Sequence, residues 1–368
     1  MTKLRDICRF QSGGTPSRGT PAYFNGNVPW ITTVALNGDV IDGNQAIEWI
    51  TGEAIAKSAA KIVPPHSVMV GTRVGIGKVA INSVPMSTSQ DIISLIGIDE
   101  NKWDKKFICH LITANKEHLT SQARGATIKG IKIEAIADLV LPEISLTEQA
   151  RISEVIGKVD ALMHMHQQMA MNLEQLIKSR FIELFGDIVL NPFGWEKDYL
   201  GVVCDVRDGT HDSPHYHSTG FPLVTSKNVT GGEIDLTDCS LISEADFNKI
   251  NERSKVNMGD IIMPMIGTVG KPVIVNVEPN FAIKNVSLIK FKDDSRVLNT
   301  FVRSLLQSDY FDDAVLSKVR GGTQKFISLG DIRKLAVIVP PMELQEQFAT
   351  FVKQTDKSKL CSKMEVAA

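Results

Sequence analysis

The tract Val28-Pro29-Trp30-Ile31-Thr32-Thr33 recurs later in the chain as Phe221-Pro222-Leu223-Val224-Thr225-Ser226. The two tracts are separated by 221 − 28 = 193 residues. The same offset relates three further pairs: Gly38 and Gly231, Gly77-Lys78 and Gly270-Lys271, and Ser94-Leu95-Ile96 and Ser287-Leu288-Ile289. Matches that keep their order over such a length indicate an internal repeat, so we expect two copies of one fold.

The repeat continues towards the end of each copy, where the offset drifts by a few residues. The later pairs are Phe107 and Phe301, Arg124-Gly125-Ala126-Thr127 and Arg320-Gly321-Gly322-Thr323, Lys129 and Lys325, and Glu148-Gln149 and Glu346-Gln347. Each copy therefore contains a globular segment and the beginning of the segment that follows it.

The globular segments, residues 1–144 and 194–341, are rich in glycine, proline, asparagine and threonine and contain short β-branched runs. Runs of this kind between turn residues predict strands. The clearest predicted strands are 68–70, 79–81, 92–96, 261–263 and 273–275. Helical stretches are expected around residues 102–122 and 298–316, so each copy should form a mixed α/β domain.

The segment between the two domains, residues 145–186, is predicted to form one long helix that begins at a capping-box sequence, Ser145 to Glu148. Apolar residues then recur at heptad spacing: Ile152, Val155, Val159, Leu162, Met169, Leu173 and Leu176. A neighbouring row provides a second packing face: Ile156, Met163, Ala170, Ile177 and Leu184. At 1.5 Å per residue this helix would be about 60 Å long, which suits a spacer.

A second helix, residues 342–368, is predicted after Pro340-Pro341, with Phe348 and Val352 on its apolar stripe. Its 368 − 342 + 1 = 27 residues make it shorter than the 185 − 147 + 1 = 39 of the first helix. If the two helices pair, they must run antiparallel, because each leaves one domain and heads for the other. The expected fold class is α+β: two repeated mixed α/β domains separated by long antiparallel coiled-coil helices.

The composition narrows the class of protein. A chain of 368 residues that is 43% apolar and 22% charged is typical of a globular protein with two domains. The net charge of −2 means that nucleic-acid binding would need locally clustered basic residues or a partner that supplies positive charge. Five scattered cysteines without a CxxC pair indicate reduced, structural thiols. With no signal sequence or membrane span, a cytoplasmic location is expected.

Motifs of catalysis and metal binding are incomplete. The tracts from Gly71 to Lys78 and from Gly267 to Lys271 lack the Ser or Thr that follows the lysine of a phosphate loop, so we interpret them as turns with exposed lysines. Asn191-Pro192-Phe193 lacks the second proline of a methyltransferase motif and is interpreted as a helix stop. Three histidines between residues 211 and 217 have no metal-ligand spacing.

What remains is a duplicated set of hydrogen-bond donors: Arg124, Thr127 and Lys129 in one copy, and Arg320, Thr323 and Lys325 in the other. Arg, Lys and Thr are residues that reach phosphates and base edges. Two copies of one recognition domain in a single chain are suited to a binding site that consists of two separated parts of a long polymer. The sequence therefore predicts binding to double-stranded DNA.

The whole chain resembles the specificity subunits of type I restriction–modification systems. The resemblance rests on ordered tracts: Gly13-Gly14-Thr15-Pro16, Ser89-Gln90-Asp91-Ile92, Asp208-Gly209-Thr210-His211, the two Gly-Lys turns, Arg320-Gly321-Gly322-Thr323 with Lys325, and Pro340-Pro341 with Glu346-Gln347. It implies that each domain reads one half of an interrupted DNA site. It also implies that the helices dock two methyltransferase subunits, which use S-adenosylmethionine, and that restriction subunits using ATP and Mg²⁺ join them. The shorter distal helix departs from the family pattern and predicts weaker docking of one methyltransferase.

The resemblance and the donor types together define the candidate residues. Candidate DNA contacts are Thr15, Thr33, Arg73, Lys78, Gln90, Arg124, Thr127, Lys129, Thr210, His211, Lys227, Asn228, Lys271, Asn285, Arg320, Thr323 and Lys325. Candidate residues for helix or partner packing are Ile152, Val155, Val159, Leu162, Met169, Leu173, Leu176, Phe348 and Val352. No catalytic residue, metal or cofactor is expected in this chain. The alternatives are an enzyme acting on nucleic acid and a two-headed adaptor for proteins or glycans; the adaptor would lack salt-sensitive affinity for DNA.

Overall fold

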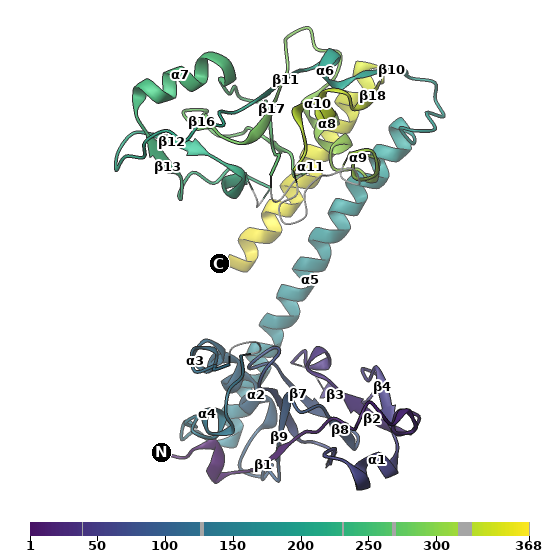
Figure 1. Cartoon of the computed structure of the whole chain (residues 1–368), viewed down its shortest axis with the longest axis vertical. Helices are drawn as coiled ribbons and strands as arrows, with labels where there is room; N and C mark the ends of the chain where they lie inside the picture. Colours follow the sequence, from purple (N-terminus) through teal and green to yellow (C-terminus); the bar gives the residue numbers. More distant parts are fainter. Residues whose placement is uncertain (39, 126–128, 230–231, 267–269, 316–325, 368) are drawn as a thin grey trace. The chain divides into compact units, whose positions relative to one another are not determined.

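The structure is a computed structural model of the chain (Figure 1). It describes all residues except 39, 126–128, 230–231, 267–269, 316–325 and 368, and no side chain from 360 onwards. The chain divides into two compact units, residues 1–163 and 164–368, which we describe one at a time. In the described part of the chain, every helix is too short or too polar to cross a membrane.

The first unit contains two sheets. The larger sheet has the order β1 (Arg9–Ser12), β9 (Ile92–Ile96), β6 (Val68–Gly71), β7 (Val79–Asn82) and β3 (Val40–Ile41). The smaller sheet has the order β4 (Glu48–Ile50), β2 (Val28–Ile31), β8 (Met86–Thr88) and β5 (Ile62–Val63). All four residues of β6 and of β7 are buried, so these central strands are covered on both faces.

Short helices complete the first unit: η1 (Leu4–Asp6), η2 (Pro21–Phe24), η3 (Thr33–Ala35), α1 (Gly52–Lys57), α2 (Lys105–Ala114), α3 (Lys116–Ser121) and α4 (Ile133–Ala137). Helix α2 begins where Asp104 accepts a hydrogen bond from the backbone N–H of Phe107 at 2.6 Å. Ile108 and Ile112, one turn apart on α2, are fully buried with Val68 and Leu95 of the larger sheet.

The second unit has three sheets. The largest has the order β11 (Asp205–Asp208), β17 (Val286–Lys290), β14 (Ile261–Pro264) and β15 (Val273–Ile274). The others are β13 (Ser240–Ile242), β12 (Phe221–Val224) and β16 (Ala282–Ile283), and the pair β10 (Glu196–Tyr199) and β18 (Ala336–Val339). Its helices are η4 (Ser226–Val229), α6 (Leu200–Val203), α7 (Glu244–Ser254), α8 (Asn299–Leu305), α9 (Asp309–Ala314), α10 (Leu329–Arg333) and α11 (Met342–Ala367).

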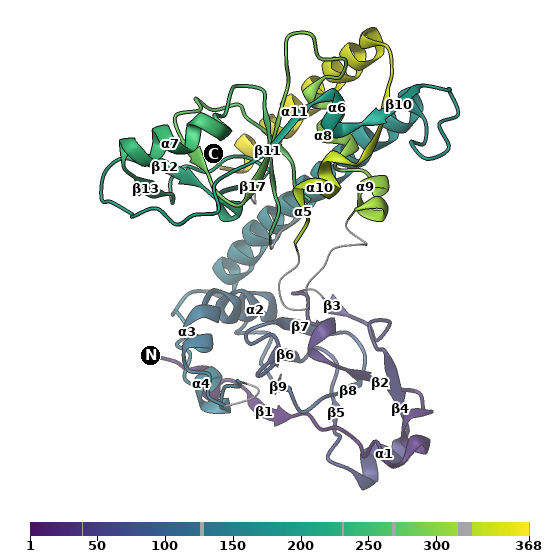
Figure 2. The ribbon, with the colours of Figure 1, turned by 45° about the horizontal axis from the view of Figure 1, so that its top comes forward.

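The two units share one topology, which confirms the repeat predicted from the sequence. The order β1-β9-β6-β7 in the first unit corresponds to β11-β17-β14-β15 in the second, and β4-β2-β8 corresponds to β13-β12-β16. Figure 2 labels the strands β1, β9, β6 and β7 of the first unit. The tracts that revealed the repeat contain β2 and β12. Each of these strands makes a parallel pair, Ile31 with Thr88 and Val224 with Ile283.

The long helix α5 occupies Leu146–Phe185 without interruption. In the second unit its C-terminal half lies beside α11 (Figure 1). Phe348, near the start of α11, packs against Phe181 with 5.5 Å between the ring centroids, whereas Lys359, further along α11, pairs with Glu174 at 2.9 Å. Partners therefore move backwards along α5 as α11 advances, and the two helices are antiparallel as predicted.

The first predicted heptad row on α5 does not provide the packing within this chain, which corrects one expectation. Its members Val155, Val159, Leu162, Met169 and Leu176 are between 40% and 54% exposed, and only Ile152 and Leu173 are partly buried. Two residues of the second row pack instead: Ile177 and Leu184 join Phe181 and Phe185 in the hydrophobic core of the second unit, whereas Met163 of the same row is 44% exposed. The predicted residues of α11, Phe348 and Val352, are buried in that same core.

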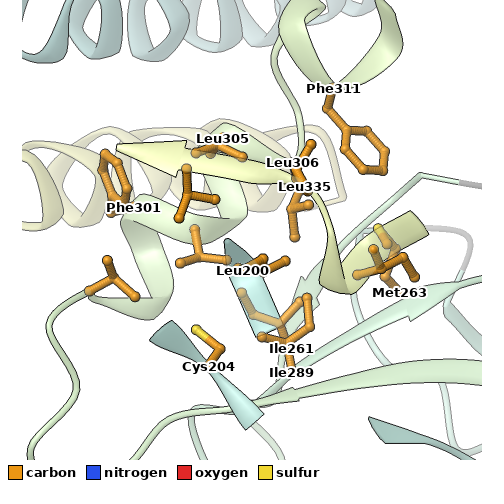
Figure 3. Close-up of a cluster of buried hydrophobic side chains, with 14 of the residues drawn as sticks. Leu200, Cys204, Ile261, Met263, Ile289, Phe301, Leu305, Leu306, Phe311 and Leu335 are labelled. Carbon is orange, nitrogen blue, oxygen red and sulfur yellow. The ribbon is translucent and has the colours of Figure 1, made fainter. Parts of the chain in front are cut away.

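Figure 3 shows part of this core, where Leu200, Ile261 and Ile289 from the sheet side lie opposite Phe301 and Leu305 of α8. Phe301 also stacks on Phe181 of α5, with 5.4 Å between the ring centroids. The aromatic rings thus join the second domain to both helices. Burial of such large side chains makes this junction a main source of stability for the second unit.

A buried glutamine fastens each domain to the helix that follows it. Gln149 accepts a hydrogen bond from the backbone N–H of Asp104 and donates to the carbonyls of Lys102 and Ile144. In the second unit Gln345 accepts from the N–H of Leu298 and donates to the carbonyls of Arg296 and Pro340. Gln149 therefore corresponds to Gln345, and the alignment of Gln149 with Gln347 was wrong.

Candidate nucleic-acid interface

The first segment of the candidate interface follows β1 in the first unit and β11 in the second, and it begins with a glycine. Gly13, after β1, donates to the carbonyl of Ile92, and a Cβ at this position would lie 2.1 Å from the carbonyl oxygen of Ser89. Gly209, after β11, donates to the carbonyl of Val286, and its Cβ would lie 2.4 Å from the oxygen of Ile283. Only glycine permits this close approach, which explains why both recognition tracts contain it.

Three segments meet in the first unit around the turn between β6 and β7. The backbone N–H of Thr72 in this turn donates to the carbonyl of Asp91 at 2.8 Å, next to the candidate Gln90. The carbonyl of Thr72 accepts from Ile131 at 2.8 Å, at the end of the loop that carries Arg124 and Lys129. The structure therefore brings together the predicted residues of three segments: the turn between β6 and β7, the segment after β8, and the loop after α3.

Exposed basic side chains surround this turn. Lys78 lies over Gly75, with its Cδ 2.8 Å from where a Cβ of Gly75 would be, and Arg73 lies over Gly130 in the same way. Lys116 of α3, which sequence reasoning missed, adds a charge beside Gly77. Among the described residues, no carboxylate lies within 4.0 Å of Lys78, Lys116, Arg124 or Lys129, whereas Arg73 is 3.6 Å from Asp91. The local charge is positive although the net charge of the chain is negative.

The second unit repeats the anchoring of this loop. The backbone N–H of Ile327 donates to the carbonyl of Met265 at 2.9 Å, as Ile131 does to Thr72. Lys271, the counterpart of Lys78, is exposed at the end of the equivalent turn. The candidates Thr127, Arg320, Thr323 and Lys325 lie outside the described residues.

The segment after β11 carries a hydrogen-bonded cluster that has no counterpart among the described residues of the first unit. His211 places Nε2 2.9 Å from Oδ2 of Asp208 and Nδ1 2.9 Å from Oδ1 of Asn285. Asp208 is buried and also pairs with Arg253 of α7. Hydrogen bonds to Asn285 and Asp208 raise the pKa of His211 above its ordinary value. Thr210, the neighbouring candidate, pairs through its backbone with Lys284.

Neither a reactive thiol among Cys8, Cys109 and Cys204 nor a cluster of metal ligands is found in the described part of the chain. Burial raises the pKa of the Cys8, Cys109 and Cys204 thiols to about 12, so these cysteines stay protonated near neutral pH. Across the described ranges no group of three or more His, Cys, Asp or Glu residues is placed to hold a metal ion.

Comparison with known families decides the assignment. Residues 1–175 and 192–364 match the family model described as the type I restriction modification DNA specificity domain. The chain belongs to this family of specificity subunits. The two matched ranges cover one repeat each, so family membership extends to both units.

Curated proteins named as type I specificity subunits are similar to the whole or to part of this chain. The MjaIX specificity subunit of Methanocaldococcus jannaschii is 25% identical, and the match covers 96% of this chain and 85% of the relative. The EcoR124I/EcoR124II specificity subunit of Escherichia coli is 30% identical over 43% of this chain and 40% of the relative. The crystal structure of the S subunit from M. genitalium has the same fold, with a TM-score of 0.59 at 15% identity over 100% of this chain and 91% of that one.

Two of the candidate contacts of this specificity subunit are buried, and the structure assigns them a supporting role instead. Thr33 is 6% exposed, and its methyl group lies 3.6 Å from the Cβ position of Gly71. Asn228 is 3% exposed; its Oδ1 accepts from Thr225, and its Nδ2 donates to the carbonyls of Asp235 and Asp238. Because Asn228 uses its whole amide inside the loop, it has no atom left for a ligand.

The remaining candidates that lie within the described residues are at least partly accessible. Thr15 and Asn285 are half-buried and Gln90 is exposed. Lys227 is exposed and lies 3.5 Å from Asp238. The residues that sequence reasoning missed are Lys116, Asp208, Arg253 and Lys284. Of these, Asp208 carried a usable signal, because it directly precedes the Gly-Thr-His tract.

Proposed function

We propose that this chain supplies the DNA sequence specificity of a type I restriction–modification complex and performs no catalysis itself. One observation carries the proposal: the same two-sheet domain occurs twice, each copy with a loop anchored against the turn between its central strands. Each domain would read one half of an interrupted site on double-stranded DNA. Lysine and arginine beside such a turn would contact phosphates, and the neighbouring amides would reach base edges.

The exposed apolar row on α5 supports a role in docking other subunits. Val155, Leu162 and Leu176 are each about half exposed, although apolar side chains in regular heptad order are usually covered. We propose that two methyltransferase subunits cover this row and that restriction subunits join the resulting complex. S-adenosylmethionine, ATP and Mg²⁺ would be bound by those partners rather than by this chain.

We expect the isolated chain to bind DNA weakly and its complex with the methyltransferase to bind tightly and specifically. The reason is the net charge of −2, which leaves only the local basic patches to attract DNA. Fluorescence anisotropy with labelled duplexes at several salt concentrations measures both affinities. Nanomolar, site-specific binding by the isolated chain would contradict this expectation. A complex without salt-dependent affinity for DNA would instead favour an adaptor for proteins or glycans.

Replacing Lys129 by alanine in the complex is expected to weaken DNA binding at every sequence, because a lysine that contacts a phosphate does not distinguish bases. The slope of log affinity against log salt concentration should fall by about one. Lys325→Ala should act in the same way through the repeat. Lys106→Ala is the matched control, since Lys106 is exposed on α2, outside the three segments. An unchanged affinity for Lys129→Ala would show that this side chain is only solvated.

A further inference from the structure

His211 lies between two hydrogen-bond acceptors. One ring nitrogen is 2.9 Å from a carboxylate oxygen of Asp208, and the other is 2.9 Å from the amide oxygen of Asn285. A neutral imidazole has one donor nitrogen and one acceptor nitrogen, so it satisfies only one of these partners. Both bonds form together when the ring carries two protons.

The two nitrogens differ in how firmly they hold a proton. The carboxylate of Asp208 is an acceptor only, so Nε2 remains the donor in either state of the ring. Nδ1 is then the nitrogen that gains or loses the proton. When Nδ1 is unprotonated it becomes an acceptor, and the amide of Asn285 must turn by half a rotation to present Nδ2 to it.

Asn285 is held in a way that leaves this rotation possible. Its backbone has φ +56°, a conformation that asparagine tolerates well, and its N–H donates to the carbonyl of Thr210 at 3.2 Å. In the described part of the chain, His211 is the one hydrogen-bond partner of the Asn285 side chain. The side of the amide turned away from His211 therefore presents Nδ2 in one state and Oδ1 in the other.

We propose that the protonation state of His211 selects which atom of the Asn285 amide faces the DNA, and so which base edge the second domain prefers at one position. This inference rests on the proposed function and identifies Asn285 as a specificity-determining residue and His211 as its positioning residue. With Nδ2 outward, the amide matches acceptors such as N7 and O6 of guanine or O4 of thymine. With Oδ1 outward, it matches donors such as N6–H of adenine or N4–H of cytosine.

The charged groups around His211 set the pH range of the change. Asp208 of β11 favours the protonated ring, whereas Arg253 of α7 opposes it. Lys284, next to Asn285, is engaged with Ser213 at 2.6 Å, and Asp212 adjoins the ring along the chain. Because its pKa is raised, His211 loses its proton as the pH rises through a value above the ordinary 6.5 of histidine. The ring is 61% exposed, so it exchanges protons freely with solvent.

The first repeat provides an internal control. Gly13 and Gly209 donate equivalent backbone hydrogen bonds, to the carbonyls of Ile92 and Val286, so Ser12 occupies the position that Asp208 has in the second unit. Thr15 then takes the place of His211. The first domain thus has no titrating ring in this segment, and its half of the DNA site should be read alike at all moderate pH values.

The test uses the complex of this chain with its methyltransferase and a library of duplexes that are randomised in both half-sites. Bound sequences are determined at about pH 6, below the ordinary pKa of histidine, and at about pH 8.5, well above it. We expect the base preference at one position of a single half-site to shift about tenfold, the effect of one matched hydrogen-bonding pair. The other half-site should give the same preferences at both pH values.

Variants distinguish the cluster from other causes. His211→Gln should abolish the pH dependence, whereas His215→Gln, an exposed histidine in the same loop, should retain it. Asn285→Asp keeps the shape of the side chain but offers acceptors alone, so it should favour donor-bearing bases at both pH values. Specific binding by the wild-type complex with pH-independent preferences would overturn this inference while leaving the proposed function intact, as would a pH shift that persists in His211→Gln. Absence of any sequence-specific binding would overturn both.

Discussion

Replacing residues 194–341 by the equivalent domain of another specificity subunit is expected to change one half of the recognised DNA site completely and to leave the other half unchanged. Each unit has its own hydrophobic core and its own copy of the anchored turn. Each mismatched base pair costs about 1–3 kcal/mol, so three changed positions lower the affinity for the original site by at least about a hundredfold.

The structure adds a condition for this chimera that is not evident from the domain boundaries predicted from the sequence. The core of the second domain extends beyond residues 194–341, because Phe301 packs against Phe181 and Phe185 of α5. A donor domain with a small residue at this position would leave a cavity under both rings. The chimera should therefore keep phenylalanine at 301, and a version with alanine there serves as the control for a stability defect.

Mapping of methylated sites in cells that carry the chimera measures the outcome. The expected map keeps one half-site and replaces the other. A map in which both half-sites change would contradict independent reading by the two domains. Loss of all methylation in the version with alanine at position 301 alone would show that the packing between the second domain and α5 had failed, and not the recognition of DNA.

The repeat was predictable because many short sequence matches occur in the same order in both halves of the chain. This order is retained even where the individual residues differ. The strands Val28–Ile31 and Phe221–Val224 share one identical residue. Each nevertheless makes a parallel pair with the equivalent strand of its own unit, β8 in the first and β16 in the second. Hydrophobic pattern and turn residues were sufficient for the fold because both act locally.

Register was harder to predict than topology. The tract around Gln345 reads Glu-Leu-Gln-Glu-Gln, and matching the Glu-Gln pair of the first repeat selected the second glutamine. In the structure Gln345 and Gln149 make the same three hydrogen bonds to backbone groups more than 40 residues earlier in the chain or at the end of the preceding segment. Such distant partners leave no trace in local spacing.

The candidate site shows the same limit. Residue type alone placed Asn228 and Asn285 in one class, because both are asparagines near turns. The side-chain amide of Asn228 donates its hydrogen bonds to carbonyls of its own loop. The side chain of Asn285 instead forms a hydrogen bond with His211, which is 74 residues away in sequence. Which amide remains available depends on contacts that only the folded chain defines.

The two apolar rows of α5 were both visible in the sequence, but their roles were not. Spacing cannot rank two rows that lie side by side on one helix. The aromatic rings of Phe181 and Phe185 determine which row packs within the chain. They bring the face that carries Ile177 and Leu184 against the hydrophobic core of the second unit. The other row remains exposed and is the one that we propose meets a partner.

Replacing Phe348 by alanine is expected to destabilise the second unit by about 3–5 kcal/mol, the usual cost of deleting a fully buried ring. Phe348 is 0% exposed and contacts the rings of both Phe181 and Phe185, with 5.5 Å between centroids in each case. Its removal leaves a cavity at the point where α11, α5 and α8 meet. The remaining rigid rings, on α5 and α8, relax little, so the cavity should persist.

Hydrogen exchange measured by mass spectrometry resolves the effect by element. Backbone amides of α8 and β17 should exchange faster in Phe348→Ala, while those of β9 in the first unit should not change. Phe351→Ala is the matched control: Phe351 is half-buried one turn further along α11, and the Arg180 guanidinium lies 5.9 Å from its ring centroid. Because part of that ring is in contact with water, its loss should cost about 1 kcal/mol. Equal effects of the two substitutions would mean that the aromatic cluster does not hold the helices to the second domain.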